Sequence, residues 1–73
     1  MGIRVGREGL LKWEREQSKV EIPYREGSWK EGTIRYIESE DMFAVVFDNG
    51  LKIELGDGQN VKYGGKSYLT DLR

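Results

Sequence analysis

Cysteine and histidine are both absent from this 73-residue chain, and proline occurs only once. Without cysteine the chain has neither a disulfide nor a thiolate metal site. Without histidine it lacks the side chain that most often carries protons near neutral pH, so its four serines have no histidine to activate them. These absences weigh against an enzyme, and we predict no catalytic residue, no metal ligand and no cofactor.

Other signatures of catalysis and ligand chemistry are also missing. The carboxylates of Glu38, Glu40 and Asp41 are close in sequence, but they lack the spacing of an EF-hand loop. Gly56-Asp57-Gly58 is followed by neither a helical pattern nor a Lys-Ser/Thr pair, so it does not match a phosphate-binding loop. A single domain of this size also offers little concave volume for a substrate.

Long hydrophobic runs are absent as well. The longest, from Met42 to Phe47, is far shorter than the roughly 20 residues that a membrane-spanning helix requires. The N-terminus alternates charged residues with glycine, where a secretory signal would carry an apolar stretch. We therefore expect a small soluble domain with an intracellular location, cytoplasmic or nuclear, and no membrane partner.

The net charge is close to zero at −1, but the charges are unevenly spread. Residues 1–37 carry eight basic against six acidic side chains, whereas residues 38–73 carry four against seven. This surface lacks the strong positive field of a non-specific nucleic-acid binder. The basic residues of the first half are Arg4, Arg7, Lys12, Arg15, Lys19, Arg25, Lys30 and Arg35.

The chain does contain short strand patterns separated by glycine. Residues 43–47 are apolar throughout, and residues 51–55 alternate apolar and charged side chains on either side of Asn49-Gly50. An Asn-Gly pair between two such runs predicts a hairpin with a two-residue type I′ turn. Gly64-Gly65, between residues 61–63 and 66–69, predicts a second turn of the same type.

Two further strands are predicted before the Asn-Gly hairpin. Residues 20–24 alternate and include Pro23, which marks an edge or an end, and residues 29–37 form a longer strand with a bend at Gly32. Residues 25–28 are predicted to form the turn between them, and residues 70–73 a terminal helical turn. Tyr36 and Phe43 are predicted to form a cross-strand pair.

About five short antiparallel strands are too few for a two-sheet sandwich, so we predict that the sheet curls into a small, strongly bent barrel over residues 19–73. Residues 1–18 are predicted to form an extended or irregular lead-in, because three glycines and the lack of an N-cap residue before Leu10 disfavour a helix there. Residues 10–14 nevertheless fit a helical stripe and residues 11–15 also alternate as a strand would, so helix, strand and loop stay open for residues 10–17. In that segment Trp13 either caps the core or is available to a partner. The predicted core consists of Val20, Ile22, Ile34, Val45, Leu51 or Ile53, and Leu69.

The order of these motifs resembles the Tudor-like group of SH3-like barrels, over residues 19–55 and again over 68–73. The matching segments are Val20-Glu21-Ile22-Pro23-Tyr24, Trp29-Lys30-Glu31-Gly32-Thr33-Ile34, Val45-Val46-Phe47-Asp48-Asn49-Gly50 and Leu69-Thr70-Asp71-Leu72. The resemblance implies an all-β, five-stranded antiparallel SH3-like barrel. It also implies recognition of a methylated Lys or Arg side chain in an aromatic cage.

Carried over to this chain, the cage would use Tyr24 and Phe47 as walls and Asp48 or Asn49 as a polar clamp. The aromatic expected shortly before Gly32 falls instead on Lys30, and Trp29, one residue away, faces the other side of a regular strand. We predict that Trp29 is exposed and acts as a binding anchor.

Two classes of function follow. The first is a non-catalytic module that binds a peptide or protein partner, a methylated side chain included, through Tyr24, Trp29, Phe47, Asp48 and Asn49. The second is a nucleic-acid-associated module that uses the eight basic residues of the first half. Tyr63 and Tyr68 beside the Gly64-Gly65 turn could also stack a base, but such surfaces normally lie in a basic groove, and only Lys62 and Lys66 are near them in sequence. A small accessory or bacteriophage-type protein that docks on a larger host protein is a variant of the first class.

Overall fold

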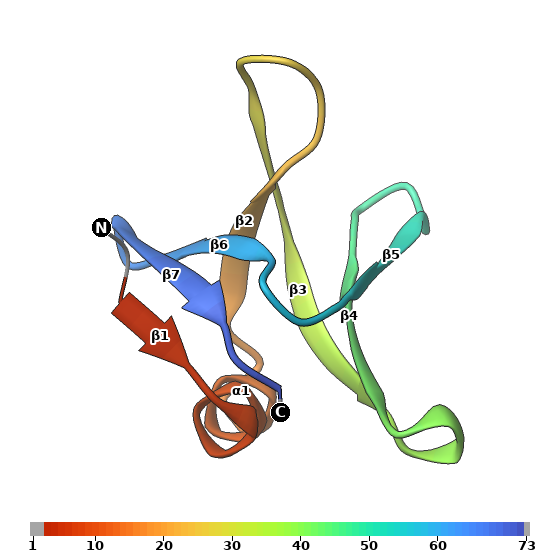
Figure 1. Cartoon of the computed structure of the whole chain (residues 1–73). Coiled ribbons are helices and arrows are strands. Elements are labelled where there is room, and N and C mark those ends of the chain that lie inside the picture. The colour runs from red at the N-terminus through yellow and green to blue at the C-terminus, as the bar shows by residue number, and fades with distance from the viewer. Residues whose placement is uncertain (1–2, 73) are drawn as a thin grey trace.

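The computed structural model describes residues 3–72, so Met1 and Gly2 of the predicted lead-in and Arg73 of the predicted barrel lie outside the described residues. Within that range the chain forms strands, one α-helix and one 3-10 turn (Figure 1). In chain order these are β1 (Ile3–Val5), α1 (Arg7–Arg15), β2 (Lys19–Pro23), β3 (Trp29–Ile37), η1 (Glu38–Glu40), β4 (Met42–Val46), β5 (Lys52–Leu55), β6 (Asn60–Tyr63) and β7 (Lys66–Thr70).

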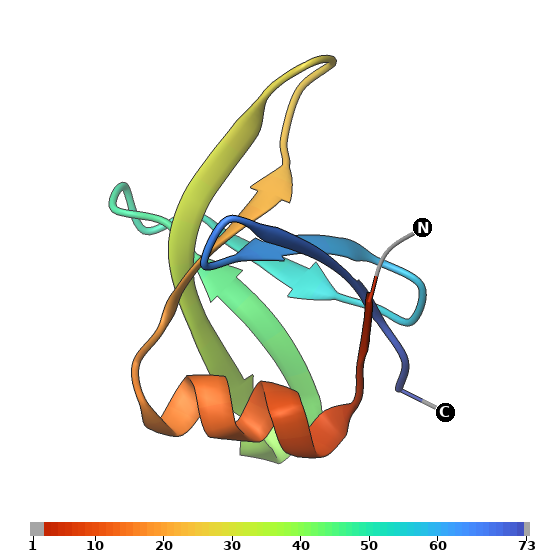
Figure 2. The same cartoon turned by 90° about the vertical axis from the view of Figure 1, so that its left-hand side faces the viewer.

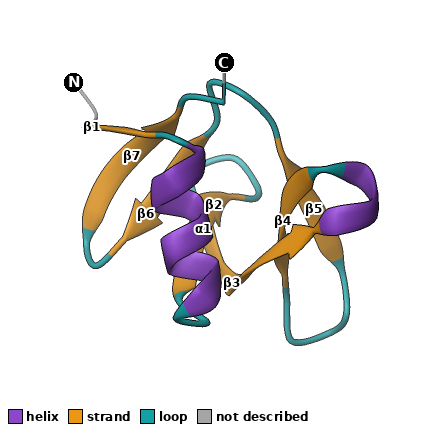
Figure 3. Cartoon of the chain, turned by 90° about the horizontal axis from the view of Figure 1, so that it is seen from below, coloured by secondary structure: helices purple, strands orange, loops and turns teal. Residues whose placement is uncertain are grey.

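The strands form one mixed sheet in the order β1-β7-β6-β2-β3-β4-β5. β1 runs parallel to β7, and every other neighbouring pair is antiparallel. The sheet curves strongly but is not closed, and α1 lies across the opening beneath it (Figures 2 and 3). The all-β prediction is confirmed, with one short helix added. The prediction of five antiparallel strands is wrong, because β1 joins the sheet as a parallel strand and both arms of the Gly64-Gly65 hairpin are complete strands.

The prediction of an irregular lead-in is also wrong, because that segment contains β1 and α1. Leu10 and Trp13, one helical turn apart, are both buried in the core. Tertiary burial of such a face outweighs the modest loss of helix propensity at glycine. Gly9 also has a packing role: a Cβ there would lie 2.7 Å from Cγ2 of Val5, so glycine lets the helix approach β1 closely.

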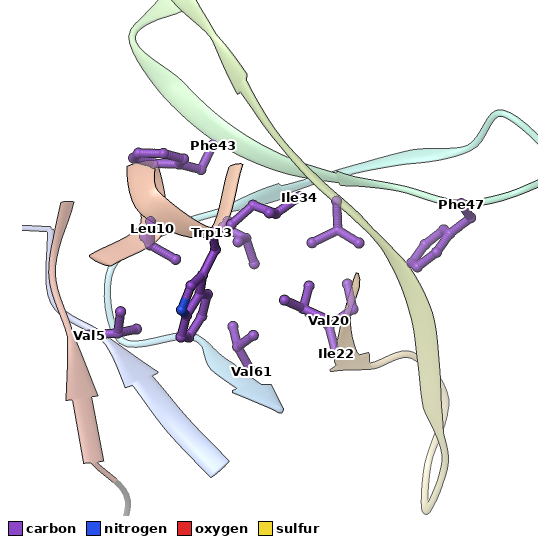
Figure 4. Close-up of a cluster of buried hydrophobic side chains, with 11 residues drawn as sticks. Val5, Leu10, Trp13, Val20, Ile22, Ile34, Phe43, Phe47 and Val61 are labelled. Atoms are coloured by element: carbon purple, nitrogen blue, oxygen red, sulfur yellow. The ribbon is translucent and has the colours of Figure 1, made fainter. Parts of the chain in front are cut away.

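The core extends from Leu10 and Trp13 on α1 to Phe47, which lies beside β3 (Figure 4). Val20, Ile22, Ile34 and Val45 are fully buried, which confirms these predictions. Ile53 and Leu69 are only half-buried, and Leu51 is 42% exposed because it lies at the turn. The full set of buried apolar residues is Val5, Leu10, Trp13, Val20, Ile22, Ile34, Phe43, Ala44, Val45, Phe47, Leu55 and Val61.

The two glycine turns differ. Gly64 and Gly65 have φ of +59° and +81°, in agreement with the predicted two-residue type I′ turn. The Asn49-Gly50 turn has three residues instead of two: the amide of Gly50 donates to the Phe47 carbonyl (2.9 Å), and the amide of Phe47 donates to the Leu51 carbonyl (2.8 Å). Only Gly50 has a positive φ there, +87°, as in a type I turn followed by a glycine bulge.

The terminal helical turn predicted over residues 70–73, with Thr70 or Asp71 as its cap, is wrong for the described residues 70–72: residues 71–72 are not helical, and Thr70 ends β7 and is 1% exposed. Its hydroxyl accepts a hydrogen bond from the Gln59 amide and donates one to the Gly56 carbonyl, both at 2.7 Å. Thr70 thereby fixes the loop between β5 and β6. The predicted Tyr36–Phe43 pair is confirmed by the β3–β4 register, with ring centroids 5.0 Å apart.

Gly32 permits a close approach between β3 and β4. A Cβ at this position would lie 2.5 Å from Cγ1 of Val45, 2.7 Å from Cδ1 of Phe47 and 2.8 Å from the Val46 carbonyl oxygen. We expect Gly32→Ala to lower the free energy of unfolding by about 1–3 kcal/mol through overpacking, measured by urea denaturation. Gly56→Ala is the matched control, since a Cβ there meets nothing within 4 Å. Equal midpoints for the two variants would contradict this packing.

A polar cluster joins the start of α1 to the loop between β3 and β4. Arg7 Nη2 donates to Asp41 Oδ1 at 2.7 Å, and the Tyr36 hydroxyl donates a short hydrogen bond to the same oxygen. The hydrogen bond from Tyr36, followed by that from Arg7, holds the pKa of Asp41 below its ordinary value. The bond to Asp41 in turn raises the pKa of Tyr36.

Because folding lowers the pKa of Asp41, this cluster stabilises the fold above the unfolded pKa of about 4, and the contribution is lost as the pH falls through the folded pKa. Asp41→Asn, which tolerates the left-handed backbone found here (φ +50°), is expected to reduce Tm slightly at pH 7. The gap in Tm from the parent should narrow between pH 7 and pH 2. Glu40→Gln, in the same loop, is the control, and a gap that stayed constant with pH would exclude this role.

Candidate functional site

The β2–β3 hairpin extends above the rest of the sheet (Figures 1 and 2). Residues 25–28 form its turn, as predicted: the Ser28 amide donates to the Arg25 carbonyl at 2.9 Å, and Gly27 has a φ of +76°. Tyr24 and Trp29 stand on either side of this turn, and each is 37% exposed. An open hollow of about 460 Å³ is lined by residues 23–29.

The fold brings the two predicted cage walls together. The rings of Tyr24 and Phe47 meet edge to face, with centroids 5.8 Å apart and planes at 80°. Phe47, however, is only 3% exposed and belongs to the core, next to β3 (Figure 4). It therefore supports Tyr24 from beneath, and Tyr24 is the wall that reaches solvent.

Cationic side chains of this same protein lie beside these two rings. Nζ of Lys30 lies 5.1 Å from the Tyr24 ring centroid and 5.3 Å from that of Phe47. The guanidinium carbon of Arg25 lies 5.6 Å from the Tyr24 centroid. Lys30, found where the resemblance led us to expect an aromatic wall, thus occupies the position that a ligand cation would take.

Trp29 lies on the opposite face of the hairpin. Its neighbour Lys30 pairs with the buried Ile22, so Trp29, paired with Pro23, points outward by strand alternation. Its ring carries a cation too: Nζ of Lys62, on β6, lies 4.3 Å from the ring centroid. The predicted exposure of Trp29 agrees with the structure, whereas Trp29 does not complete a cage with Tyr24 and Phe47.

The predicted polar clamp lies in the β4–β5 turn, where Asp48 and Asn49 are both exposed. Oδ1 of Asn49 accepts a hydrogen bond from the Leu51 amide at 2.9 Å, so this oxygen already has a structural role in the turn. Asp48 keeps its carboxylate at the surface beside Phe47.

The eight basic residues of the alternative prediction are distributed over β1, α1, β2, β3 and the hairpin turn. Arg4 pairs with Asp71 at 3.9 Å and Arg7 with Asp41 at 2.7 Å. Lys12 and Arg15, together with Glu8, line a second hollow of about 500 Å³ along α1. Lys19 lies at the start of β2 and Arg35 within β3, so only Arg25 and Lys30 are at the hairpin end.

Trp13 caps the core and is 7% exposed. It stacks on Tyr63 with centroids 4.3 Å apart, and it forms a T-shaped pair with Tyr68 with centroids 5.0 Å apart. These three rings therefore pack against one another, and one face of Tyr63, which was considered for base stacking, is already stacked on Trp13.

Lys62 is the site residue that sequence reasoning missed. It reaches the hairpin because β6 pairs with β2 through Glu21 and Lys62, which are 41 positions apart in the chain. Lys62 lies in a short run with no local signal for that pairing. Its alternation with Val61 and Tyr63 indicated a strand, but not the strand beside it.

Within residues 3–72, no three acidic side chains gather in a way that would hold a metal ion. No helix of the described chain is both long enough and apolar enough to cross a membrane. Comparisons with protein-family models, with curated proteins and with solved structures returned no match. The resemblance to Tudor-like barrels therefore rests on the sequence motifs.

Proposed function

We propose that this chain is a non-catalytic binding module that holds a segment of a protein partner over the end of the β2–β3 hairpin. The observation that carries the proposal is the exposure of Tyr24 and Trp29, 37% each, on a hairpin that extends from the sheet. We call this end the tip surface and define it by Tyr24, Arg25, Trp29, Lys30 and Lys62.

The composition of the tip surface suits an interface anchor. Tryptophan, tyrosine and arginine are the residues that most often carry binding energy at protein interfaces. Tyr24 is backed by the buried Phe47, and Trp29 begins a strand that pairs on both sides further along. Such support reduces the conformational entropy lost on binding. The hollow at residues 23–29 is large enough for a side chain of the partner.

The positive charges of Arg25 and Lys30 disfavour the methylated cation that the Tudor-like resemblance implies as the ligand. A methylated Lys or Arg of a partner would meet Arg25 and Lys30 on the ring of Tyr24. Like charges at such distances repel one another. The tip therefore supports an unmodified peptide or protein segment better than a methylated cation.

A nucleic-acid-associated module is the second candidate, because exposed rings beside basic side chains are typical of single-strand binding sites. Glu21, Glu26 and Glu31 belong to the same hairpin, and they reduce the positive field that a polyanion requires. A folded host protein that docks on the same tip surface, as in a small accessory protein, is a form of the first candidate.

Replacement of Trp29 tests the proposal. Peptides would be selected from a displayed random library on the parent protein, and their Kd measured by fluorescence anisotropy. Trp29→Ala is expected to weaken binding by about 2 kcal/mol, roughly thirtyfold in Kd, because an interface anchor is lost. Its free energy of unfolding should change by less than about 1 kcal/mol, because the ring is partly exposed.

The matched control is Ile3→Ala, which removes an exposed apolar side chain from β1, an edge strand of the sheet that does not pair with β2 or β3. It should leave peptide binding unchanged. If Trp29→Ala instead unfolded the protein while the folded fraction bound normally, Trp29 would be structural and the tip surface would not be the binding site.

A further inference from the structure

We infer that the partner segment is acidic: the tip surface recognises a peptide whose carboxylates engage Arg25, Lys30 and Lys62 while an apolar side chain contacts the exposed rings. This inference rests on the proposed function and specifies the chemistry of its partner. Its basis is the set of three cationic groups at the tip, none of which pairs with a carboxylate of residues 3–72.

Three positively charged side chains lie close to the two partly exposed rings of the tip surface. Nζ of Lys30 lies 5.1 Å and Cζ of Arg25 5.6 Å from the ring centroid of Tyr24, and Nζ of Lys62 lies 4.3 Å from the ring centroid of Trp29. Among residues 3–72 the ion pairs are Arg4–Asp71 and Arg7–Asp41, so none of the three tip cations has a described carboxylate within 4 Å.

A ring face attracts a cation but leaves its N–H donors without a strong acceptor. A carboxylate satisfies these donors with charge-assisted hydrogen bonds, which are roughly twice as strong as neutral ones. Lys30 and Arg25 also share the ring of Tyr24, so a negative group between them relieves their mutual repulsion. A cationic ligand would increase that repulsion.

The acidic residues of the hairpin do not already supply this carboxylate. Glu21 is the register partner of Lys62, yet the ammonium group of Lys62 lies over Trp29 and makes no ion pair with Glu21. Glu26 lines the hollow from the exposed turn. Glu26 should therefore repel an acidic ligand. Removal of its charge should strengthen the binding of such a ligand, whereas removal of a tip cation should weaken it.

The two faces of the hairpin indicate the arrangement of the ligand. Tyr24 with Lys30 is on the inner face and Trp29 with Lys62 on the outer face, and Tyr24 and Trp29 flank the turn. A chain that crosses the turn can contact both ring–cation pairs. This favours acidic side chains on both sides of an apolar one.

The test is an NMR titration of ¹⁵N-labelled protein in low-salt buffer with a capped peptide that has glutamates on both sides of a central leucine. The same peptide with glutamine in place of glutamate is the comparison. We expect the glutamate peptide to shift the amides of residues 24–30 and of Lys62 and to bind about tenfold more tightly than the glutamine peptide.

Substitutions at the tip should change this preference selectively. Lys30→Gln and Lys62→Gln should each weaken binding of the glutamate peptide about threefold or more and leave the glutamine peptide nearly unchanged. Glu26→Gln should strengthen binding of the glutamate peptide. Lys12→Gln is the matched control, because Lys12 is on α1 at the opposite end of the molecule (Figure 2). The amide spectrum of each variant reports whether it is folded.

The inference is overturned if a trimethyllysine peptide, or a short single-stranded oligothymidine, binds the tip more tightly than the glutamate peptide. It is also overturned if the glutamate and glutamine peptides bind equally or not at all. In those cases the library peptides test the proposed function separately. If neutral library peptides bind and their binding depends on Trp29, the chain is still a binding module, but it has no preference for acidic partners.

Discussion

The close approach of β3 to β4 at Gly32 is the constraint on which both the core and the tip surface depend. With no side chain at this position, Val45 and the ring of Phe47 fill the space beneath the curved strand. Phe47 is thereby buried at the hairpin end of the core and supports Tyr24 edge to face. A methyl group at Gly32 would press on both Val45 and Phe47, so core packing and the geometry of the candidate site are coupled at this position.

The opposite end of the core is closed by α1, and the division of the aromatic residues follows from this arrangement. Six of the eight aromatic rings belong to the hydrophobic core or pack against it, with Trp13 of the helix stacked on Tyr63. The exceptions, Tyr24 and Trp29, are both at the tip and both exposed. The binding role proposed above for the tip surface rests on this division of the rings between core and surface.

Local patterns predicted the parts of the fold that depend on neighbouring residues. Alternation located the strands around Val20 and Ile34, and Gly64-Gly65 specified its own turn because both positions require a positive φ. The helix could not be predicted, because the stabilising burial of Leu10 and Trp13 comes from distant strands, whereas the cost of Gly9 is visible locally. The tip shows the same limit. Trp29 was predicted as exposed from alternation, but the Lys62 ammonium reaches it through a pairing of β2 with β6.

The cations at the tip change how the resemblance to Tudor-like barrels is interpreted. An aromatic cage attracts a ligand cation because the ring faces are negative and otherwise unfilled. Here Lys30 replaces an expected wall and places its own ammonium over the rings of Tyr24 and Phe47. The ring faces then hold a charge supplied by the chain, and a partner meets cationic groups where a cage would offer empty ring faces. On the proposal made above, this exchange of one aromatic for one lysine changes the preferred ligand from a cation to a carboxylate without a change in the hairpin that displays it.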